Sequence, residues 1–336
     1  MNLDEFKKNI DFNAKPVNQY LKKILIGEPA KLYKASSKYI ETGGKRLRPL
    51  MVIKSCEMLG GSLNDAIPGA ASVELIHNFS LVHDDIMDND DFRHSTSTIH
   101  KEYGIPVAIL AGDILFSKAF QILTSNADEN PNLNKKSILD MIIRLSSACV
   151  KVCEGQALDV SFADNKEFPS EEKYIDMINK KTAALFEVSC AIGALSSPKS
   201  DDKDVTNLAA FGKHVGIAFQ LIDDLIGVIG DPLITGKAVG NDIREGKKTY
   251  PILLALKKSN RIEKDEILHF FGNKKSTDIE LKNVVKILLS LDIEKEVRDK
   301  ASYHMNKAIE HINKYENNYS KQTLLDIAKF IVLRST

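Results

Sequence analysis

The chain has 336 residues, of which 43% are hydrophobic and 27% charged, a composition typical of a globular protein with a substantial core. Its 46 basic residues balance its 46 acidic ones, so the formal net charge is zero. No global field therefore attracts nucleic acid or an anionic membrane surface, and any charge that serves function must be local.

The N-terminus and the cysteines favour a cytoplasmic protein. The first residues, MNLDEFKKNI, are charged and lack the apolar segment of a signal peptide. No apolar run approaches the roughly 20 residues that a membrane span needs, so we expect no such span. The cysteines show neither disulfide nor zinc spacing, which suggests a reducing compartment. Cys149 and Cys153 lie four residues apart and could form a metal half-site, but two small core residues are the favoured interpretation.

Apolar residues recur with a period of about 3.6 along nearly the whole chain, and no alternating pattern indicates a strand. Several segments are apolar nearly all round, which predicts that their helices are central. No linker, repeat or composition break divides the chain, so residues 1–336 are predicted to form one all-α domain. The expected helices cover residues 17–27, 29–41, 49–59, 68–90, 106–124, 137–162, 171–196, 203–229, 249–257, 278–290, 294–315 and 320–333.

The expected helix over 68–90 ends in the acidic segment LVHDDIMDNDD. Asp84 and Asp88 lie four residues apart, so they share one helix face about 6 Å apart along the axis. Two carboxylates so placed repel each other and need cations when they are partly buried. Oxygen ligands at this spacing suit Mg²⁺ that keeps some water and holds a phosphate group.

A second acidic pair, Asp223 and Asp224, lies near the end of the apolar helix expected over 203–229. Either cluster alone could be an acidic helix end on the surface. Two such clusters, each near the end of an apolar helix, favour a shared metal site.

Phosphate groups also need cationic donors, preferably arginine, whose fork matches their oxygens. Taken singly, basic residues most often belong to a solvated face. Here basic loops follow both acidic helix ends, which predicts cations around two diphosphates, one bridged by metal and one not. The candidate donors are the basic or histidine side chains Lys45, Arg46, Arg48, Arg93, His94, His100, Lys181, Lys237, Arg244, Lys247 and Lys248, and the neutral hydroxyl of Thr182.

Seven segments follow one another in order: GGKRLRP, ELIHNFSLVHDDIMDNDDFR, LAGDILFSKAF, EGQALD, KTAALFE, FQLIDDLIG and TGKAVGNDIREGKKT. Their order and spacing, over about residues 40–255, resemble the trans-isoprenyl diphosphate synthases. The resemblance implies a helical bundle around a deep central cavity, usually a homodimer. It also implies Mg²⁺-assisted condensation of isopentenyl diphosphate with dimethylallyl, geranyl or farnesyl diphosphate.

The resemblance assigns metal and cation-facing roles to the acidic motifs and their neighbours. Asp84 and Asp88 bind two of three Mg²⁺ ions and Asp223 the third. Asp85 and Asp224 support these metal ligands. The oxygen dipoles that face the developing allylic cation come from Thr182 and Gln220.

The resemblance also separates the residues that hold the two diphosphates. The allylic diphosphate is held by Arg93, Lys181 and Lys237, and a loop closed by Lys247 covers the pyrophosphate. Isopentenyl diphosphate, without metal, is held by Lys45, Arg48 and His77. A lone histidine on an apolar helix is more often a core residue, but the position of His77 two turns before Asp84 favours ligand contact.

Two positions depart from the family pattern. After Arg93 the family usually continues with Arg, Gly and Pro, whereas this chain has His94 followed by Ser, Thr and Ser. His94 can donate to a phosphate but is neutral for much of the time near pH 7, which predicts weaker or more pH-dependent use of isopentenyl diphosphate. Gly227 stands where many members have a third aspartate, a form that resembles the archaeal branch.

Product length is expected to depend on the helix that carries the first aspartates. Ser80 lies one turn below Asp84 on nearly the same face, and Phe79 sits beside it. Bulky side chains here form the floor of the family's cavity. A single aromatic residue five positions before the first aspartate resembles archaeal geranylgeranyl synthases, although Phe79 could also merely pack the core.

Several alternatives remain open. A farnesyl or longer-chain polyprenyl diphosphate synthase differs only in product length. A class I terpene cyclase lacks the second diphosphate site that Lys45, Arg48 and His77 indicate. A non-catalytic subunit of a heteromeric synthase is expected to lose metal ligands or cations, and only His94 and Gly227 point that way.

Overall fold

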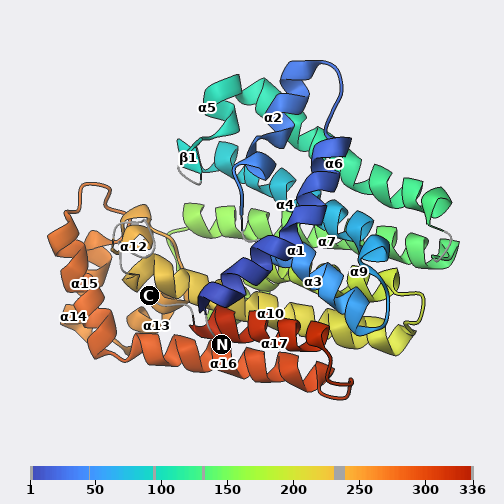
Figure 1. Ribbon diagram of the computed structural model, residues 1–336. Coiled ribbons are helices and arrows are strands. Elements are labelled where there is room, and N and C mark those ends of the chain that lie inside the picture. The colour runs from blue at the N-terminus through green and yellow to red at the C-terminus, as the bar shows by residue number, and fades with distance from the viewer. Residues whose placement is uncertain (1–2, 45, 94–95, 131–132, 231–238, 334–336) are drawn as a thin grey trace. The chain divides into compact units, whose positions relative to one another are not determined.

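The computed structural model describes residues 3–44, 46–93, 96–130, 133–230 and 239–333. Helices make up most of these residues, which confirms the predicted all-α fold class (Figure 1). The chain divides into two compact units, and the extent of a single domain over residues 1–336 stays a prediction. Unit 1 comprises Met1–Cys149, Leu185–Gly212 and Tyr315–Asp326, and unit 2 comprises Val150–Ala184, Lys213–Lys314 and Ile327–Thr336.

The central helix of unit 1 is α4 (Leu63–Met87), which packs against α6 (Ile105–Glu129) and α3 (Leu47–Met58). A capping box at Ser62 and Asp65 satisfies backbone N–H groups at its start. Its buried residues point in nearly every direction, as its uniformly apolar sequence predicts. The further helices are α1 (Leu3–Ile24), α2 (Ala30–Glu41), α5 (Ile99–Tyr103), the first part of α7 (Lys135–Asp164) and α9 (Ala184–Ser196).

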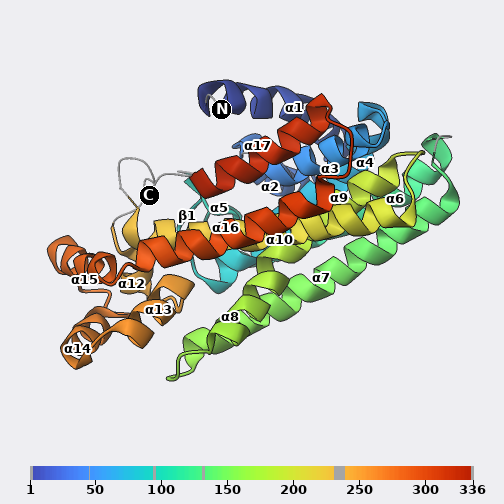
Figure 2. The same ribbon diagram turned by 90° about the horizontal axis from the view of Figure 1, so that it is seen from below.

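Unit 2 is built around the last parts of α7 and of α10 (Asp202–Ile229). Within it α13 (Tyr250–Lys258) packs against α16 (Ile293–Ile312), and α14 (Arg261–Phe270) packs against α15 (Asp278–Ser290) (Figure 2). The final helix, α17 (Tyr319–Leu333), contributes residues to both units. The other helical elements of unit 2 are α8 (Glu171–Ile178), a π turn (Asn179–Ala183) and α12 (Asn241–Glu245).

The structure differs from the sequence prediction in a few elements. Helix α1 begins well before residue 17 and continues through Pro16. The sequence prediction does not include α5 and α12, which have five residues each and cannot repeat an apolar pattern over several turns. It also omits α14, whose ten residues include one buried residue, Ile267, and so form no apolar stripe. The sequence predicts no strand, and this expectation is wrong at one place. Two antiparallel strands of two residues each, β1 (Phe92–Arg93) and β2 (Thr96–Ser97), pair with each other. The segment 171–196 is not one regular helix, since the π turn interrupts it.

The expectation of no apolar run of membrane length also has an exception. The stretch Ile105–Ser125 of α6, with a mean hydropathy of 1.5, is long and apolar enough by these two criteria to cross a membrane. It contains two charged residues, Asp113 and Lys118, and its inner residues pack on α4. This combination also occurs in core helices of globular proteins.

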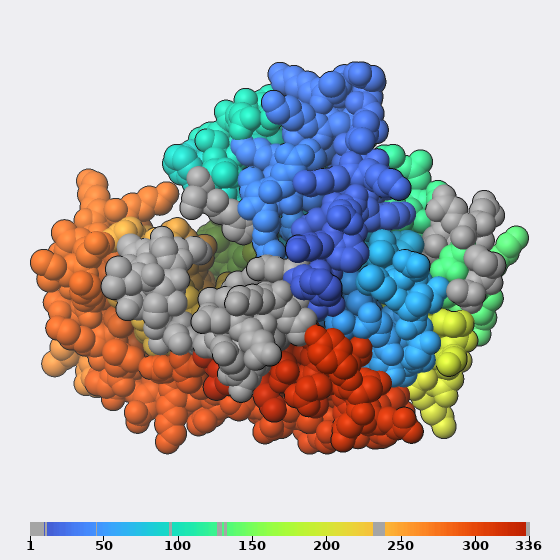
Figure 3. Space-filling model, viewed as in Figure 1, coloured from blue at the N-terminus to red at the C-terminus, as the bar shows by residue number. Residues whose placement is uncertain are grey.

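All four cysteines are free thiols, in agreement with the lack of disulfide spacing. Cys56, Cys149 and Cys190 are buried, whereas Cys153 is exposed on α7. Burial raises the pKa of both the Cys56 and the Cys190 thiol to about 12, so these two stay protonated near neutral pH. Figure 3 shows the surface that the N-terminal helices of unit 1, coloured blue, present to solvent.

Candidate active site

Both carboxylate oxygens of Asp85, in the first acidic motif, accept hydrogen bonds from side chains of the protein. Asp85, at the end of α4, is only 1% exposed. The hydroxyl of Tyr39 on α2 donates to its Oδ2, and the guanidinium of Arg93 approaches its Oδ1 at 2.5 Å (Nη2) and 2.6 Å (Nε). Burial, followed by the hydrogen bond to Asp85, raises the pKa of Tyr39, which keeps this hydroxyl a donor. Asp85 therefore holds Arg93 in place. The two predicted metal ligands of the same motif are more accessible, since Asp84 is partly exposed and Asp88 is exposed.

The hairpin after α4 orients Arg93 beside the acidic motif. Thr98 Oγ1 donates to the Asp90 carbonyl at 2.8 Å, and the Ile99 N–H donates to the Tyr39 hydroxyl at 3.1 Å. The chain therefore folds back on the end of α4, with Arg93 in β1 and paired with Thr96 in β2. Figure 1 shows β1 near the end of α4. His94 lies outside the described residues.

The start of α3 is fixed by a buried ion pair. Arg46, with a left-handed φ of 47°, lies 2.6 Å from Glu74 Oε1 and donates to the Ile40 carbonyl and to Asn18 Oδ1. Asn78 donates to the same Glu74 oxygen at 3.0 Å. Arg46 was a candidate cation, but the structure uses it inside the protein to set the geometry of the loop before α3. Lys45 is outside the described residues.

Arg48 and His77, predicted to share one diphosphate, lie together in unit 1. Arg48 Nη1 is 3.3 Å from His77 Nε2, which brings the first turn of α3 next to α4. The Arg48 guanidinium also lies 4.4 Å from the centre of the Phe186 ring on α9, a cation–π contact. Stacking on this ring restrains the direction of the guanidinium.

The second acidic motif forms a hydrogen-bonded chain in unit 2. The Tyr174 hydroxyl donates to Asp224 Oδ2, and Gln220 Nε2 donates to Oδ1 at 2.7 Å. Gln220 Oε1 in turn accepts from Thr182 Oγ1 at 2.7 Å, so both predicted cation-facing side chains are fixed. Burial raises the pKa of Asp224 to about 7, and the Tyr174 hydrogen bond opposes that shift. Asp223 is exposed on the same helix turn.

The π turn positions Lys181 and Thr182. A side chain at Gly155 on α7 would overlap the Lys181 backbone, which explains the glycine in the segment EGQALD. Lys181 Nζ pairs with Asp159, four residues beyond Gly155, at 2.5 Å. π turns of this kind frequently occur at functional sites.

The structure gives a steric reason for the glycine at position 227, where many family members have a third aspartate. A Cβ at this position would overlap the carboxylate of Asp242, which approaches α10 from the short helix α12. Asp242 also adds to the rise in the pKa of Asp224. Sequence reasoning missed Asp242, because only the fold shows that it fills the space beside Gly227.

The two neighbouring lysines Lys247 and Lys248 have different environments: Lys248 donates to backbone carbonyls, whereas Lys247 is exposed. Lys248 Nζ donates to the carbonyls of Phe162, at 2.6 Å, Glu167, at 3.1 Å, and Asn165. These contacts attach the segment after α12 to the end of α7. Lys247 is exposed and pairs with Glu245 at 2.8 Å. Lys237 is outside the described residues.

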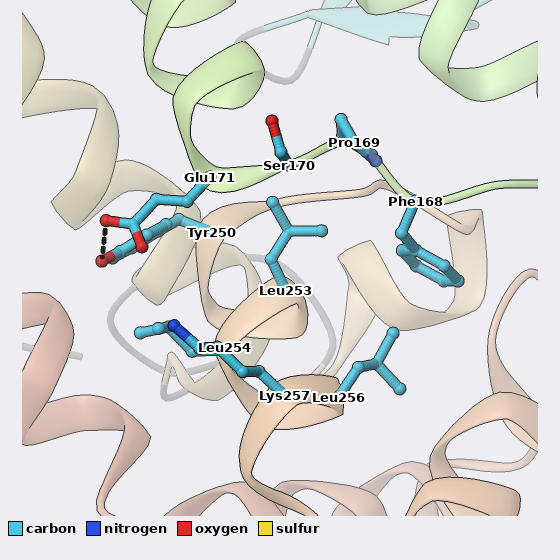
Figure 4. Close-up of a pocket in the computed structure, with 9 residues that line it drawn as sticks. All are labelled: Phe168, Pro169, Ser170, Glu171, Tyr250, Leu253, Leu254, Leu256 and Lys257. Carbon is cyan, nitrogen blue, oxygen red and sulfur yellow. Dashed lines mark hydrogen bonds between the residues drawn. The ribbon is translucent and has the colours of Figure 1, made fainter.

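Unit 2 also contains a pocket of about 230 Å³, shown in Figure 4. It has apolar walls, and Tyr250 donates to Glu171 Oε1 at 3.0 Å on one side. None of the predicted site residues lines it. Its lining residues are Phe168, Pro169, Ser170, Glu171, Tyr250, Leu253, Leu254, Leu256 and Lys257.

The acidic pairs fit Mg²⁺ that is held jointly with a substrate. Within the described residues, no group of three or more His, Cys, Asp or Glu side chains is arranged to hold a metal ion. Mg²⁺ commonly binds through one or two carboxylates plus substrate phosphates, so a pair such as Asp84 and Asp88 is a suitable partial ligand set. Asp223 belongs to the other unit, and the shared site stays a prediction.

Residues 29–288 match the family model described as polyprenyl synthetase. The chain belongs to the polyprenyl synthetase family. It is 42% identical to a short chain isoprenyl diphosphate synthase of Methanocaldococcus jannaschii, over 84% of this chain and 83% of that protein. It is 38% identical to a geranylgeranyl diphosphate synthase of Sulfolobus acidocaldarius, over 95% of each chain.

Solved structures show the same fold for this polyprenyl synthetase. A crystal structure of geranylgeranyl pyrophosphate synthetase from Pyrococcus horikoshii Ot3 has a TM-score of 0.91 at 34% identity and covers 100% of both chains. A solved structure of geranylgeranyl pyrophosphate synthetase from Geoglobus acetivorans has a TM-score of 0.86 at 34% identity and covers 97% of this chain and 99% of that chain. Both predictions, family and fold class, are confirmed.

Proposed function

We propose that this polyprenyl synthetase condenses isopentenyl diphosphate with allylic diphosphates and makes geranylgeranyl diphosphate. The observation that carries this proposal is that both acidic motifs are backed by buried hydrogen-bond networks. Asp85 orients Arg93 in one, and Asp224 orients Gln220 and Thr182 in the other. The names of the archaeal relatives support the product, since several are geranylgeranyl synthases.

In the proposed reaction the acidic residues hold up to three Mg²⁺ ions together with the allylic diphosphate. Asp84, Asp88 and Asp223 are the direct ligands, and Asp85 and Asp224 act through their neighbours. When bound, Mg²⁺ neutralises the diphosphate and so promotes cleavage of its C–O bond. The double bond of isopentenyl diphosphate then attacks the allylic cation and forms the new carbon–carbon bond, and the departing pyrophosphate accepts the proton that the product loses. Because the double bond is the nucleophile, no carboxylate forms a covalent intermediate.

The cations of the chain divide between the two diphosphates in this proposal. Arg93, Lys181 and Lys237 hold the allylic diphosphate, and Lys247 closes over the pyrophosphate. Isopentenyl diphosphate is held by Lys45, Arg48, His77 and His94. The stacking of Arg48 on Phe186 restrains its direction before substrate arrives, which lowers the entropy cost of binding.

Thr182 and Gln220 stabilise the positive charge that develops on the allylic carbon. Their hydrogen bond, and that from Gln220 to Asp224, fix both side chains before the reaction. Oxygen dipoles fixed in this way need little reorganisation when charge develops, which is the main source of electrostatic catalysis.

A longer product is the second candidate. A geranylfarnesyl diphosphate synthase of Aeropyrum pernix is 37% identical to this chain over 87% of its length. The purified chain should be incubated with Mg²⁺, isopentenyl diphosphate and each allylic starter, and the product length determined by mass spectrometry. Geranylgeranyl diphosphate as the main product supports the proposal. No turnover with any starter contradicts it and favours a non-catalytic subunit.

We also propose a cytoplasmic homodimer. Exposed apolar side chains occur on α6 and on the first part of α7, and large apolar groups are typical of subunit interfaces. These side chains are Ile109, Leu110, Leu139 and Ile143. Light scattering of the purified chain should give twice the mass of 37.4 kDa, and a monomeric mass contradicts the dimer.

A further inference from the structure

The pocket of unit 2 lies between two mainly apolar walls (Figure 4). One wall is the segment between α7 and α8, which contributes Phe168 and Pro169. The other wall is α13, which contributes Leu253, Leu254 and Leu256. Because these five side chains are apolar, the space between them favours a hydrocarbon over water.

Both walls are held by contacts within the protein. Lys248 Nζ donates to three carbonyls at the end of α7 and just after it, and lies 5.3 Å from the centre of the Phe168 ring. At the start of α13, the ring of Tyr250 stacks on Tyr174 of α8 with ring centres 5.8 Å apart. A pocket whose walls are held in this way loses little conformational entropy when a ligand binds.

The charged residues that line the pocket are Glu171 and Lys257. Glu171 Oε1 lies 3.0 Å from Lys300 Nζ and also accepts from the Tyr250 hydroxyl at 3.0 Å. The hydrogen bond from Lys300 is the main cause that lowers the pKa of Glu171, so this carboxylate stays ionised near neutral pH. Lys300 therefore neutralises Glu171, and the positive charge of Lys257 is left in excess.

Lys257 gives the pocket a cationic end. Its side chain is exposed, and within the described part of the chain no carboxylate lies within ion-pair distance of its ammonium group. Figure 4 shows the Lys257 nitrogen on the side of Glu171 and Tyr250, away from the Phe168 ring. The pocket thus combines apolar walls with a single cation at one end.

We propose that this pocket binds a short aliphatic carboxylate, with its hydrocarbon between Leu253 and Phe168 and its carboxylate beside Lys257. The volume of about 230 Å³ is below the roughly 300–1,000 Å³ of pockets for drug-sized ligands, which limits the hydrocarbon to a short chain. A single cation matches a head group with one negative charge better than a diphosphate. The inference goes beyond the proposed function and does not rest on it, because none of the predicted diphosphate ligands lines the pocket.

The test is isothermal titration calorimetry of the full chain with octanoate. The wild-type protein should bind octanoate with saturation at one molecule per chain. Octylammonium has the same hydrocarbon and the opposite charge, so it should bind about fivefold more weakly or less, the fold-change expected from one exposed charge interaction.

A charge reversal tests the role of Lys257. With Lys257→Glu the pocket carries an excess negative charge, so octylammonium should bind more tightly than octanoate. Lys264 on α14 is also exposed and does not line the pocket. The control Lys264→Glu should therefore keep the wild-type preference for octanoate.

A larger side chain at Leu253 tests the apolar part. Figure 4 shows Leu253 between the Glu171–Tyr250 pair and the Phe168 ring, so Leu253→Phe should fill this space and remove octanoate binding without a change of charge. Leu268→Phe, at a leucine on α14 outside the pocket, should keep it. Circular dichroism establishes that each variant is folded, and Lys257→Glu at its exposed position tests the site independently of Leu253→Phe.

Three results would overturn the inference. The first is that octanoate shows no saturable binding to the wild-type chain, or binds no more tightly than octylammonium. The second is a preference for octanoate that Lys257→Glu leaves unchanged, and the third is undiminished binding to folded Leu253→Phe. Prenyl transfer is not measured in these titrations, so a chain that makes no prenyl product contradicts the proposed function alone.

Discussion

Asp85 shows how a single residue of a motif can differ from its neighbours. The motif suggests three similar carboxylates, but Tyr39 and Arg93 occupy both oxygens of this one. Truncation of one partner of a buried charge pair leaves the other unsatisfied, so Asp85 and Arg93 depend on each other. Two residues of the site are therefore coupled before any substrate binds.

At Gly227 the structure predicts a steric effect of substitution. Gly227→Ala should lower the free energy of unfolding by about 1–3 kcal/mol, because the new methyl group overlaps Asp242. Urea titration measures this change. The double variant Gly227→Ala/Asp242→Gly removes the overlapping carboxylate and should recover part of the loss. Strictly additive effects of the two substitutions contradict direct contact.

His94 leads to a kinetic prediction. An imidazole loses its charge between about pH 6 and 8, so the Michaelis constant for isopentenyl diphosphate should rise over this range. His94→Arg keeps its charge and should give a lower constant that changes little with pH. Steady-state kinetics at pH 6, 7 and 8 test this expectation. A wild-type constant that is equally flat contradicts the assigned role of His94.

At the scale of elements, α10 and α16 meet at a pair of histidines in unit 2. His214 Nδ1 lies 3.0 Å from His304 Nδ1, and His311 stacks on His214. Burial, followed by the charge of His214, lowers the pKa of His304 to about 4. The charged groups that act on the pair are Lys213 on α10 and Lys300, Lys307 and Glu310 on α16.

This pair predicts that stability falls in mild acid. Between pH 6.5 and 4 the unfolded chain binds a proton at residue 304 that the folded chain does not, so the free energy of unfolding decreases as pH falls. The slope from this group is at most about 1.4 kcal/mol per pH unit. Urea titrations at pH 7 and 5 measure it. His304→Gln should reduce the slope, whereas His269→Gln, outside the pair, should not.

The long helices could be predicted from sequence because their apolar period extends over many residues. Their starts are also local, as the capping box at Ser62 and Asp65 shows. The π turn could not be predicted, since it depends on the backbone of Lys181 packing against Gly155, 26 positions earlier in the sequence. Likewise, the motifs identified Asp224 and Gln220 as candidates, but Tyr174 joins them only through the fold.

At the scale of the whole molecule, the predicted ligands belong to two units. Asp84 and Asp88 are in unit 1, and Asp223 is in unit 2. A diphosphate held with Mg²⁺ by all three is therefore expected to stabilise both units together. At a concentration 100 times its dissociation constant, such a ligand adds about 2.7 kcal/mol to the free energy of unfolding.

Thermal unfolding tests this shared site. Inorganic pyrophosphate with Mg²⁺ should raise the Tm by several degrees, and addition of EDTA should abolish the rise. Asp84→Asn and Asp223→Asn should each remove most of it, since the proposed function assigns both residues to the same bound diphosphate. If either variant keeps the full rise in Tm, pyrophosphate binds to one unit alone and the shared site is contradicted.

The exposed thiol of Cys153 makes the protein suitable for spectroscopy without further engineering. Of the four cysteines it alone is exposed, and the buried Cys56 and Cys190 stay protonated near neutral pH. A maleimide dye should therefore react first at one position on α7, two residues before Gly155 and close to the π turn that carries Lys181. We expect the fluorescence of this dye to change when substrate binds, because Lys181 on the nearby π turn is a proposed ligand of the allylic diphosphate.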